Sequence, residues 1–218
     1  MKKVLYLLLL FVLCAFQCEE EVENDQRSSV SGLIVDGNNN PLSDIKIQVI
    51  SEDLVLGESR SESNGFFNFT TLRTGYDDFR IAINRTEGSP YSRVTYVYGD
   101  SSFEERYNLD QVVLRKLATL DFKITKTSPD QNVLDFSLEY ISSECSFFFI
   151  DTNIPNSEDC YEDKIISGTL NDNQTNFETE VPSLLNTTVR FTYELNNEPP
   201  QIILIELTEA TTTYEFEY

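Results

Sequence analysis

Four cysteines are the residues of this chain best suited to chemistry, because the sequence contains no histidine. Histidine is the commonest general base and a frequent metal ligand, and both Ser-His-Asp and Cys-His catalysis require it. Cys14 and Cys18 lie near the N-terminus, whereas Cys145 and Cys160 lie in the C-terminal half. The sequence therefore leaves three kinds of chemistry to consider: modification of sulfur, disulfide formation, and catalysis or metal binding by carboxylates.

The first seventeen residues have the pattern of an export signal. Lys2 and Lys3 precede a mostly apolar stretch over residues 4–16. As a helix, this stretch would be about 20 Å long, which is too short to cross a hydrocarbon core of about 30 Å. We therefore expect residues 1–17 to be a secretory signal peptide and not a permanent membrane anchor.

Cys18 stands between this apolar stretch and an acidic segment, EEEVENDQRSS. Cleavage before Cys18 would leave its thiol at a new N-terminus, where diacylglycerol could be attached. This pattern resembles a bacterial lipoprotein signal with Cys18 as the lipidated residue, although Gln17 occupies a position where the family has a small residue. The alternative is an ordinary signal, cleaved or uncleaved, in which Cys18 has no role.

The resemblance implies a cell-envelope protein held by fatty acyl chains such as palmitate. Stable anchoring needs at least two acyl chains, and lipoprotein modification supplies two or three on one residue. The acidic run after Cys18 also resembles that of Bacteroidota-type surface lipoproteins, which implies the outer membrane, with the surface or periplasmic face undetermined. Residues 18–28 have few apolar side chains and are expected to form a flexible acidic tether.

Cys145 and Cys160 form an even pair in the part of the chain that an export signal would carry out of the cytosol. Exported compartments allow disulfides, and a bridge here would close a loop of about 15 residues, worth roughly 3 kcal/mol in the chain-entropy model. The alternative is a pair of buried free thiols. The polar surroundings of Cys160, in SEDCYED, favour the disulfide.

Acidic residues outnumber basic residues, with 37 Asp and Glu against 16 Lys and Arg and a net charge of −21. Loss of residues 1–17 would remove Lys2 and Lys3 and no acid, which leaves 14 basic residues and a net charge of −23. Such a chain repels phosphate backbones and anionic lipid surfaces. Nucleic acid is therefore not expected as a partner, and the expected membrane contact is the N-terminal lipid anchor.

Carboxylates could in principle do chemistry here. Two of them could hydrolyse a glycosidic bond, but no pair among the 37 stands out, so we expect no catalytic residues and no enzyme. The loops DGNNN, SEDCYED and NDNQTN offer oxygen ligands for calcium. None has the spacing of a calcium-binding loop, and such residues commonly bond to their own backbone in turns. We therefore predict no metal site and no cofactor.

The segment PYSRVTYVYGD places Tyr96 and Tyr98 on one face of an expected strand, with Tyr91 nearby. If that face is exposed, Tyr91, Tyr96 and Tyr98 form a recognition patch for sugars or for a protein partner. The alternative is ordinary packing within a sheet. These three tyrosines are the candidate recognition residues of the chain.

Alternating apolar and polar residues, the pattern of β-strands, recur along the chain after residue 28. We interpret YNLDQVVLRK, the nearest approach to a helix, as a strand as well. Turn-forming clusters such as DGNNNPLSD, NRTEGSP and NNEPP separate the runs at intervals of roughly ten to fifteen residues. The pattern predicts an all-β fold of two consecutive antiparallel β-sandwich domains, over residues 29–116 and 117–218.

The segment VSGLIVDGNNNPLSDIKIQVISEDLVLGESRSESNGFFNFTTL resembles the carboxypeptidase regulatory-like domain. The matching features are the strand over residues 30–34, the turn with Pro41, and the hairpin signal at 64–65 followed by Phe67 and Phe69, which should enter the core. The resemblance implies a transthyretin-like sandwich of seven strands that carries no peptidase chemistry. The second domain is immunoglobulin-like by pattern only and resembles no family.

These features predict a non-enzymatic cell-envelope lipoprotein that acts as a structural or binding accessory module on the membrane surface, with an envelope protein or a glycan as candidate partner. One alternative is a glycan-binding surface lipoprotein associated with a nutrient-uptake system, since related sandwich folds often hold carbohydrate. An exposed, coplanar set of tyrosines would favour that alternative. A hydrolase with two carboxylates in a cleft is the third hypothesis.

Overall fold

The structure is a computed structural model of the 218-residue chain, and it describes residues 27–72, 79–99, 104–149, 155 and 157–218. The predicted signal peptide, Cys18 and most of the predicted tether lie outside the described residues. Within the described ranges, all regular structure is β-strand. The same ranges contain no helix of the length and hydropathy needed to span a bilayer.

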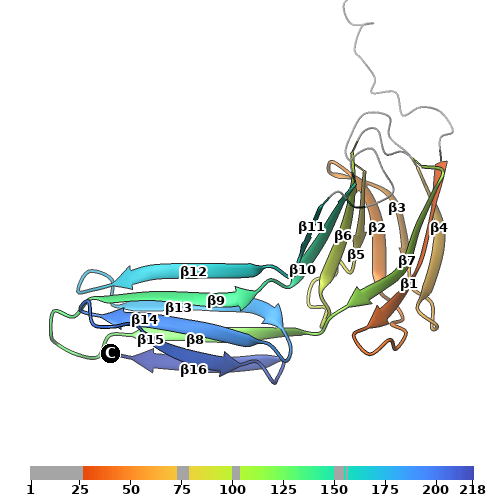
Figure 1. The fold of residues 1–218 in the computed structure, drawn as a ribbon. Helices are drawn as coiled ribbons and strands as arrows, with labels where there is room; N and C mark the ends of the chain where they lie inside the picture. The colour runs from red at the N-terminus through yellow and green to blue at the C-terminus, as the bar shows by residue number, and fades with distance from the viewer. Residues whose placement is uncertain (1–26, 73–78, 100–103, 150–154, 156) are drawn as a thin grey trace, which may run out of the picture.

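Seven strands from residues 27–114 build most of the first sandwich (Figure 1). They are β1 (Arg27–Asp36), β2 (Lys46–Ser51), β3 (Leu54–Arg60), β4 (Phe66–Leu72), β5 (Phe79–Ile83), β6 (Arg93–Tyr98) and β7 (Arg106–Leu114). A sheet in the order β4-β1-β7 faces a sheet in the order β11-β10-β6-β5-β2-β3. β7 covers most of YNLDQVVLRK, so the interpretation of that stretch as a strand is confirmed.

The remaining strands follow residue 116. They are β8 (Leu117–Thr125), β9 (Leu134–Ile141), β10 (Glu144–Phe149), β11 (Ser157–Cys160), β12 (Asp163–Leu170), β13 (Asn176–Leu184), β14 (Thr188–Leu195), β15 (Gln201–Glu206) and β16 (Thr211–Glu217). The second sandwich consists of the sheets β12-β9-β14-β15 and β13-β8-β16. The predicted all-β fold of two sandwiches is confirmed, although β1–β7, β6–β10 and β8–β16 pair in parallel.

Each sandwich has its own core, made by the inward-facing residues of its strands. Along β8, every second residue from Ala118 to Ile124 is buried, and the residues between them are partly exposed. In the first sandwich, Phe67 is buried as predicted and Phe69 packs against the core partly buried. Burying a side chain of this size contributes about 1.5–3 kcal/mol, so the alternation decides which face of each strand points inward.

Two turns of the first sandwich follow directly from their residue types. The Asp36 carboxylate accepts hydrogen bonds from the backbone N–H groups of Asn38 (2.8 Å) and Asn40 (2.9 Å), which closes the turn after β1. Gly65, before β4, has a φ of 79°, and a Cβ there would clash with the carbonyl oxygen of Ile34. Only glycine fits that position.

The predicted tether over residues 18–28 extends two residues too far. Arg27 and Ser28 already belong to β1. Ser28 is buried, and its hydroxyl donates a hydrogen bond to the carbonyl oxygen of Glu104 (2.7 Å). Because these residues are polar, the sequence does not indicate that the strand begins here. A buried serine is tolerated in a strand when its hydroxyl has a hydrogen-bond partner.

One long hairpin, residues 134–170, crosses from the second sandwich into the first, and we refer to it as the crossing hairpin (Figure 1). Its outer parts, β9 and β12, pair in the second sandwich, whereas its tip, β10 and β11, pairs in the first. β10 also lies parallel to β6. The prediction of a continuous second domain over 117–218 does not describe this pairing, because alternation identifies strands but not their partners.

The crossing hairpin is bulged where it leaves the second sandwich. Residues 142–144 on one strand lie opposite residues 161–162 on the other, between the pairs Ile141–Asp163 and Cys145–Cys160. Tyr161 adopts a φ of 54° at this point. A bulge bends and twists a β-ribbon, so the same hairpin can serve two sheets of different direction.

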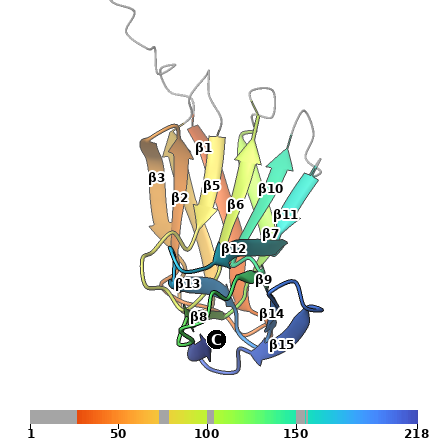
Figure 2. The ribbon, with the colours of Figure 1, turned by 90° about the vertical axis from the view of Figure 1, so that its left-hand side faces the viewer.

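The junction between the sandwiches is formed by residues 90–92, 115–117 and Tyr161. The backbone N–H of Ser92 donates to the carbonyl of Arg115 (2.7 Å), and that of Leu117 donates to the carbonyl of Pro90 (2.9 Å). The Tyr161 ring lies 4.6 Å from the Arg115 guanidinium, and its hydroxyl lies 3.1 Å from the Ser92 hydroxyl. Hydrogen bonds therefore hold the chain where it passes from one sandwich to the other. β1 begins at the end of the first sandwich that lies away from this junction (Figures 1 and 2).

Candidate functional site

Cys145 and Cys160 form a disulfide, as predicted, and the alternative of two free thiols is excluded. The two residues are direct partners in the β10–β11 ladder, and both pack against the first core. The bridge therefore closes the tip of the crossing hairpin. Cys18 lies outside the described residues, and its lipidation stays a prediction.

The predicted tyrosine patch does not lie on the surface. Tyr98 is 7% exposed, and Tyr96 is half-buried against the same core. The Tyr98 ring stacks on Phe149 at a centroid distance of 4.5 Å, and the Tyr96 ring stacks on Phe147 at 5.1 Å. Burial raises the pKa of both phenols above their usual range.

The physical reason for this correction is the crossing hairpin. β10 adds beside β6 and places its phenylalanines next to the tyrosines on the inner face, which no local pattern announces. Tyr91 lies apart from the other two, in an isolated bridge with Lys116 at the junction, and is also partly buried. The structure thus does not bring Tyr91, Tyr96 and Tyr98 together as an exposed platform.

Parts of Tyr96 and Tyr98 do line a cleft of about 360 Å³ at an edge of the first sandwich, together with Arg106 and Asp110. The residues that follow β6 and β10 in the sequence, 100–103 and 150–154, lie outside the described residues. No site is assigned to the cleft for that reason.

The oxygen-rich loops bond mainly to themselves. In NDNQTN, the Asn171 side-chain oxygen accepts from the backbone N–H groups of Asn173 (2.8 Å) and Gln174 (3.3 Å), and Asp172 pairs with Lys126. Asp36 closes the DGNNN turn in the same way. Within the described parts of the chain, no group of three or more His, Cys, Asp or Glu residues is arranged to hold a metal ion.

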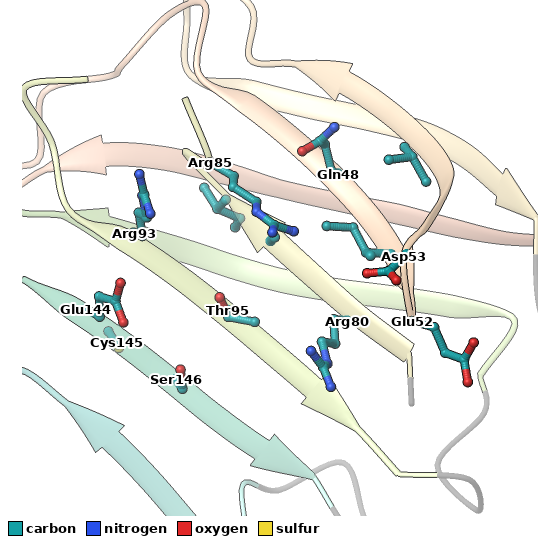
Figure 3. A pocket seen from close by; sticks show the side chains of 14 residues that line it. Gln48, Glu52, Asp53, Arg80, Arg85, Arg93, Thr95, Glu144, Cys145 and Ser146 are labelled. Atoms are coloured by element: carbon teal, nitrogen blue, oxygen red, sulfur yellow. The ribbon is translucent and has the colours of Figure 1, made fainter. Parts of the chain in front are cut away.

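A trough of about 580 Å³ lies on the outer face of the six-stranded sheet, and we term it the outer trough (Figure 3). Its floor is one row across four paired strands: Gln48 on β2, Ala82 on β5, Thr95 on β6 and Ser146 on β10. Three of these four side chains are small, which is why the face is hollow along this row.

Arginines flank the floor of the outer trough. Arg80 lies one outward position before Ala82 on β5, whereas Arg93 lies one outward position before Thr95 on the antiparallel neighbour β6. The two therefore stand on opposite sides of the floor, and Arg85 stands on the side of Arg93 (Figure 3). Glu144 lies beside Arg93 in register, and Glu52 and Asp53 lie at the far end.

The backbone that carries Arg85 and Arg93 is fixed by hydrogen bonds. Asn84 has a φ of 61°, its N–H donates to the Lys46 carbonyl (2.8 Å), and its side-chain amide donates to the carbonyls of Tyr91 (2.7 Å) and Ser92 (3.1 Å). Asn84 is buried, so these bonds are made away from water. These hydrogen bonds therefore fix the two ends of the β5–β6 connection next to each other, beside the trough.

The outer trough was missed in the sequence because it combines residues that are distant in the chain. Residues 144–146 reach it only through the parallel pairing of β10 with β6. The only part of the trough that the sequence could indicate is the segment FRIAINR, which places two arginines around a small residue, Ala82, in an otherwise acidic chain. That segment indicates the arginines beside the trough but not residues 144–146 on β10.

No protein-family model and no curated protein matches this chain. Similar solved structures include the Bacillus anthracis TIE protein (12% identity, TM-score 0.32, 88% of this chain and 33% of that one). The tip fimbrial protein Mfa3 of Porphyromonas gingivalis matches at 9% identity and a TM-score of 0.30, over 83% of this chain and 82% of that one. A DUF3823 family protein from Bacteroides ovatus matches at 10% identity and a TM-score of 0.31, over 84% of this chain and 100% of that one.

This chain thus spans about a third of the TIE protein, and 63% of a streptococcal ancillary pilin that it also resembles. TM-scores near 0.3 carry no argument about function. The fold rests on the strand pairings of the chain itself, and its resemblance to the carboxypeptidase regulatory-like domain stays a prediction.

Proposed function

We propose that this chain is a non-enzymatic lipoprotein of the cell envelope, in which two β-sandwiches form one spacer that stands off the outer membrane. The observation that carries the proposal is the position of β1. Arg27 begins β1 at the end of the first sandwich opposite the second (Figures 1 and 2). A lipid on Cys18, nine residues earlier, would hold one end of the molecule and leave the second sandwich at the other.

The junction supports a spacer because several contacts join the two sandwiches. Three crossings of the chain, backbone hydrogen bonds and the Tyr161–Arg115 contact join the sandwiches. A single flexible linker would let the second sandwich fold back towards the membrane. The crossing hairpin instead contributes strands to both sandwiches, so a two-stranded ribbon joins them in addition to the connection after β7.

The cysteine chemistry supports an exported, non-catalytic protein. Disulfides persist in oxidising compartments, and Cys145–Cys160 is such a bond. It also removes the two thiols of the sandwiches from nucleophilic chemistry. Because the sequence contains no histidine, Ser-His-Asp and Cys-His catalysis are not possible.

The test of this proposal is labelled palmitate incorporation in cells that express the full-length chain. The wild type and Cys14→Ala should incorporate label and fractionate with the outer membrane. Cys18→Ala should incorporate none and leave the membrane fraction. Cys14→Ala is the matched control because it removes a nearby thiol and keeps Cys18. Equal incorporation by Cys18→Ala would overturn the lipid anchor and, with it, the spacer role.

The glycan-binding alternative was predicted to depend on exposed, coplanar tyrosines. Because Tyr98 is buried and Tyr96 packs inward, the tyrosines do not support that role. Any ligand-binding role of the first sandwich therefore needs a different surface.

A further inference from the structure

We propose that the outer trough binds a sugar acid, that is, a ligand bearing a carboxylate among several hydroxyl groups. The proposal goes beyond the spacer role and does not depend on the lipid anchor. It rests on two arginines and two floor hydroxyl groups that have no partner among the described residues, and on the carboxylates at the ends of the trough.

The arginines supply the site for the ligand's carboxylate. Arg85 and Arg93 are exposed, and neither has an ion pair or hydrogen bond with any residue that the structure describes. Other basic residues, such as Lys46 and Arg190, are paired with glutamates at 3.0 Å. Guanidinium groups bind carboxylates through two parallel hydrogen bonds, so Arg85 and Arg93 are available for an external acid.

The floor supplies hydrogen bonds for hydroxyl groups. The Thr95 and Ser146 side chains are half-buried and have no hydrogen-bond partner among the described residues. Each hydroxyl can donate one hydrogen bond and accept two. Gln48 donates through Nε2 to Glu58 at 2.8 Å, which leaves its side-chain oxygen as an acceptor towards the trough. These groups lie in one row, so an extended polyhydroxylated ligand can contact them in turn.

The acids at the ends define the ligand further. Glu52, Asp53 and Glu144 are exposed and offer carboxylate oxygens, which accept hydrogen bonds from sugar hydroxyls. They also balance the charge of the three arginines. A polyanion such as a nucleic acid or a densely sulfated chain would meet these acids and a net charge of −21. A ligand with isolated carboxylates between hydroxyl groups meets no such repulsion.

The geometry is suited to a small or short-chain ligand. A volume of about 580 Å³ lies within the range of roughly 300–1,000 Å³ that is common for small-molecule sites. The site is preorganised, because Asn84 fixes the backbone beside Arg85 and the β6–β10 pairing fixes the opposite wall. Preorganisation lowers the entropy cost of binding.

The test is isothermal titration calorimetry of the full-length, disulfide-bonded protein with three probes: trigalacturonate, the neutral trisaccharide maltotriose, and succinate, which carries carboxylates without sugar hydroxyls. Trigalacturonate should bind at least about tenfold more tightly than either of the others, since each loses one class of hydrogen bond to a charged or polar group. Equal binding of succinate would assign the site to simple carboxylates, and equal binding of maltotriose would assign it to neutral sugars; either result overturns the proposal.

Variants locate the binding. Arg85→Gln and Arg93→Gln should each weaken trigalacturonate binding about tenfold, and the double variant should abolish it. Arg93→Lys should recover little affinity, because lysine keeps the charge but lacks the two-pronged geometry. Arg190→Gln in the second sandwich is the matched control and should bind as the wild type does. Both arginines of the trough are exposed, so circular dichroism and the melting temperature should not change.

Two outcomes would overturn the site. The first is an absence of heat with trigalacturonate at about 10 mM, a concentration at which even a weak site of millimolar dissociation constant is filled. The second is undiminished binding by a folded Arg85→Gln/Arg93→Gln double variant. Neither outcome bears on palmitate labelling of Cys18, so failure of this proposal is distinguishable from failure of the spacer role.

Discussion

The two sandwiches differ in how their sheets are completed. The second is built from strands that begin and end within residues 117–218, whereas the first takes β10 and β11 from the crossing hairpin. Phe149 and Cys145 of that hairpin are part of the first core. The first sandwich therefore cannot be complete until a strand that lies thirty residues beyond its own last strand has docked, which is a long-range contact of the kind that slows folding.

Their outer faces differ as well. In the second sandwich, Arg190 on β14 pairs with Glu139 on β9 at 3.0 Å, and Leu204 on β15 stands beside it exposed. In the first sandwich, the corresponding long side chains flank a row of small ones and leave a hollow. The same architecture thus gives a filled face or a trough according to whether the middle row carries long or short residues.

The largest expected effect is the loss of stability when one buried phenylalanine is removed from either core. Phe67→Ala and Phe191→Ala each remove a fully buried ring and should lower the free energy of unfolding by about 3–5 kcal/mol. Hydrogen exchange should show that Phe67→Ala loosens the first sandwich and leaves β8, β13 and β14 protected. Phe191→Ala should loosen the second sandwich and also β10, because β10 is continuous with β9.

Two results would contradict this expected difference between the two variants. If Phe67→Ala also removed protection from β8 and β14, the two sandwiches would unfold as one unit. If Phe191→Ala left β10 fully protected, the crossing hairpin would not transmit the loss. Phe66→Ala is a suitable control, since Phe66 is exposed and its loss should change neither pattern.

The next effect concerns the disulfide at the tip of the crossing hairpin. Replacement of both Cys145 and Cys160 by serine should destabilise the first sandwich by about 3 kcal/mol, because the bridge closes a loop of 15 residues. Urea denaturation followed by hydrogen exchange should show the loss in β10 and β6 and not in β13 or β14. Reduction of the wild type should reproduce it, and an equal loss in both sandwiches would contradict the assignment of the bridge to the first.

The residues that the sequence predicted well are those whose signal is local. The interpretation of YNLDQVVLRK as a strand was correct for β7, and the types of Asp36 and Gly65 indicated the turns that they form. The pairing of β10 with β6 was not predictable, because a parallel contact between residues 51 positions apart leaves no periodicity in either segment. The interior position of Tyr96 and the wall of the outer trough both follow from that one pairing, so both were missed together.

A smaller effect tests the junction. Tyr161→Phe removes the hydroxyl near Ser92 and should cost about 1 kcal/mol, whereas Tyr161→Ala also removes the ring beside Arg115 and should cost about 2 kcal/mol. Small-angle scattering should detect a broader distribution of shapes for Tyr161→Ala only. Unchanged scattering by Tyr161→Ala would mean that the β-ladder alone holds the two sandwiches.

The smallest effect compares two turns in which one side-chain oxygen accepts two backbone N–H groups, from a carboxylate in one turn and from an amide in the other. The Asp36 carboxylate accepts two backbone N–H groups in the first sandwich, and the neutral Asn171 amide oxygen does so in the second. Hydrogen bonds from Asn40, from its side chain first and then from its backbone, lower the pKa of Asp36 below its ordinary value of 3.8. Of the two accepting groups, only the Asp36 carboxylate is titratable, because an amide oxygen carries no acidic proton.

The direction of that response follows from the lowered pKa. Asp36 stabilises the folded turn above its unfolded pKa, and this contribution is lost as the pH falls through the lower folded value. In an NMR titration from pH 6 downwards, the amide protons of Asn38 and Asn40 should shift with a midpoint below 3.8, and Asp36→Asn should abolish the shift. The amide of Gln174 should not titrate when Asp172→Asn removes the neighbouring carboxylate. A midpoint above 3.8 at Asn38 would mean that the turn does not favour the ionised form of Asp36, which would contradict the prediction.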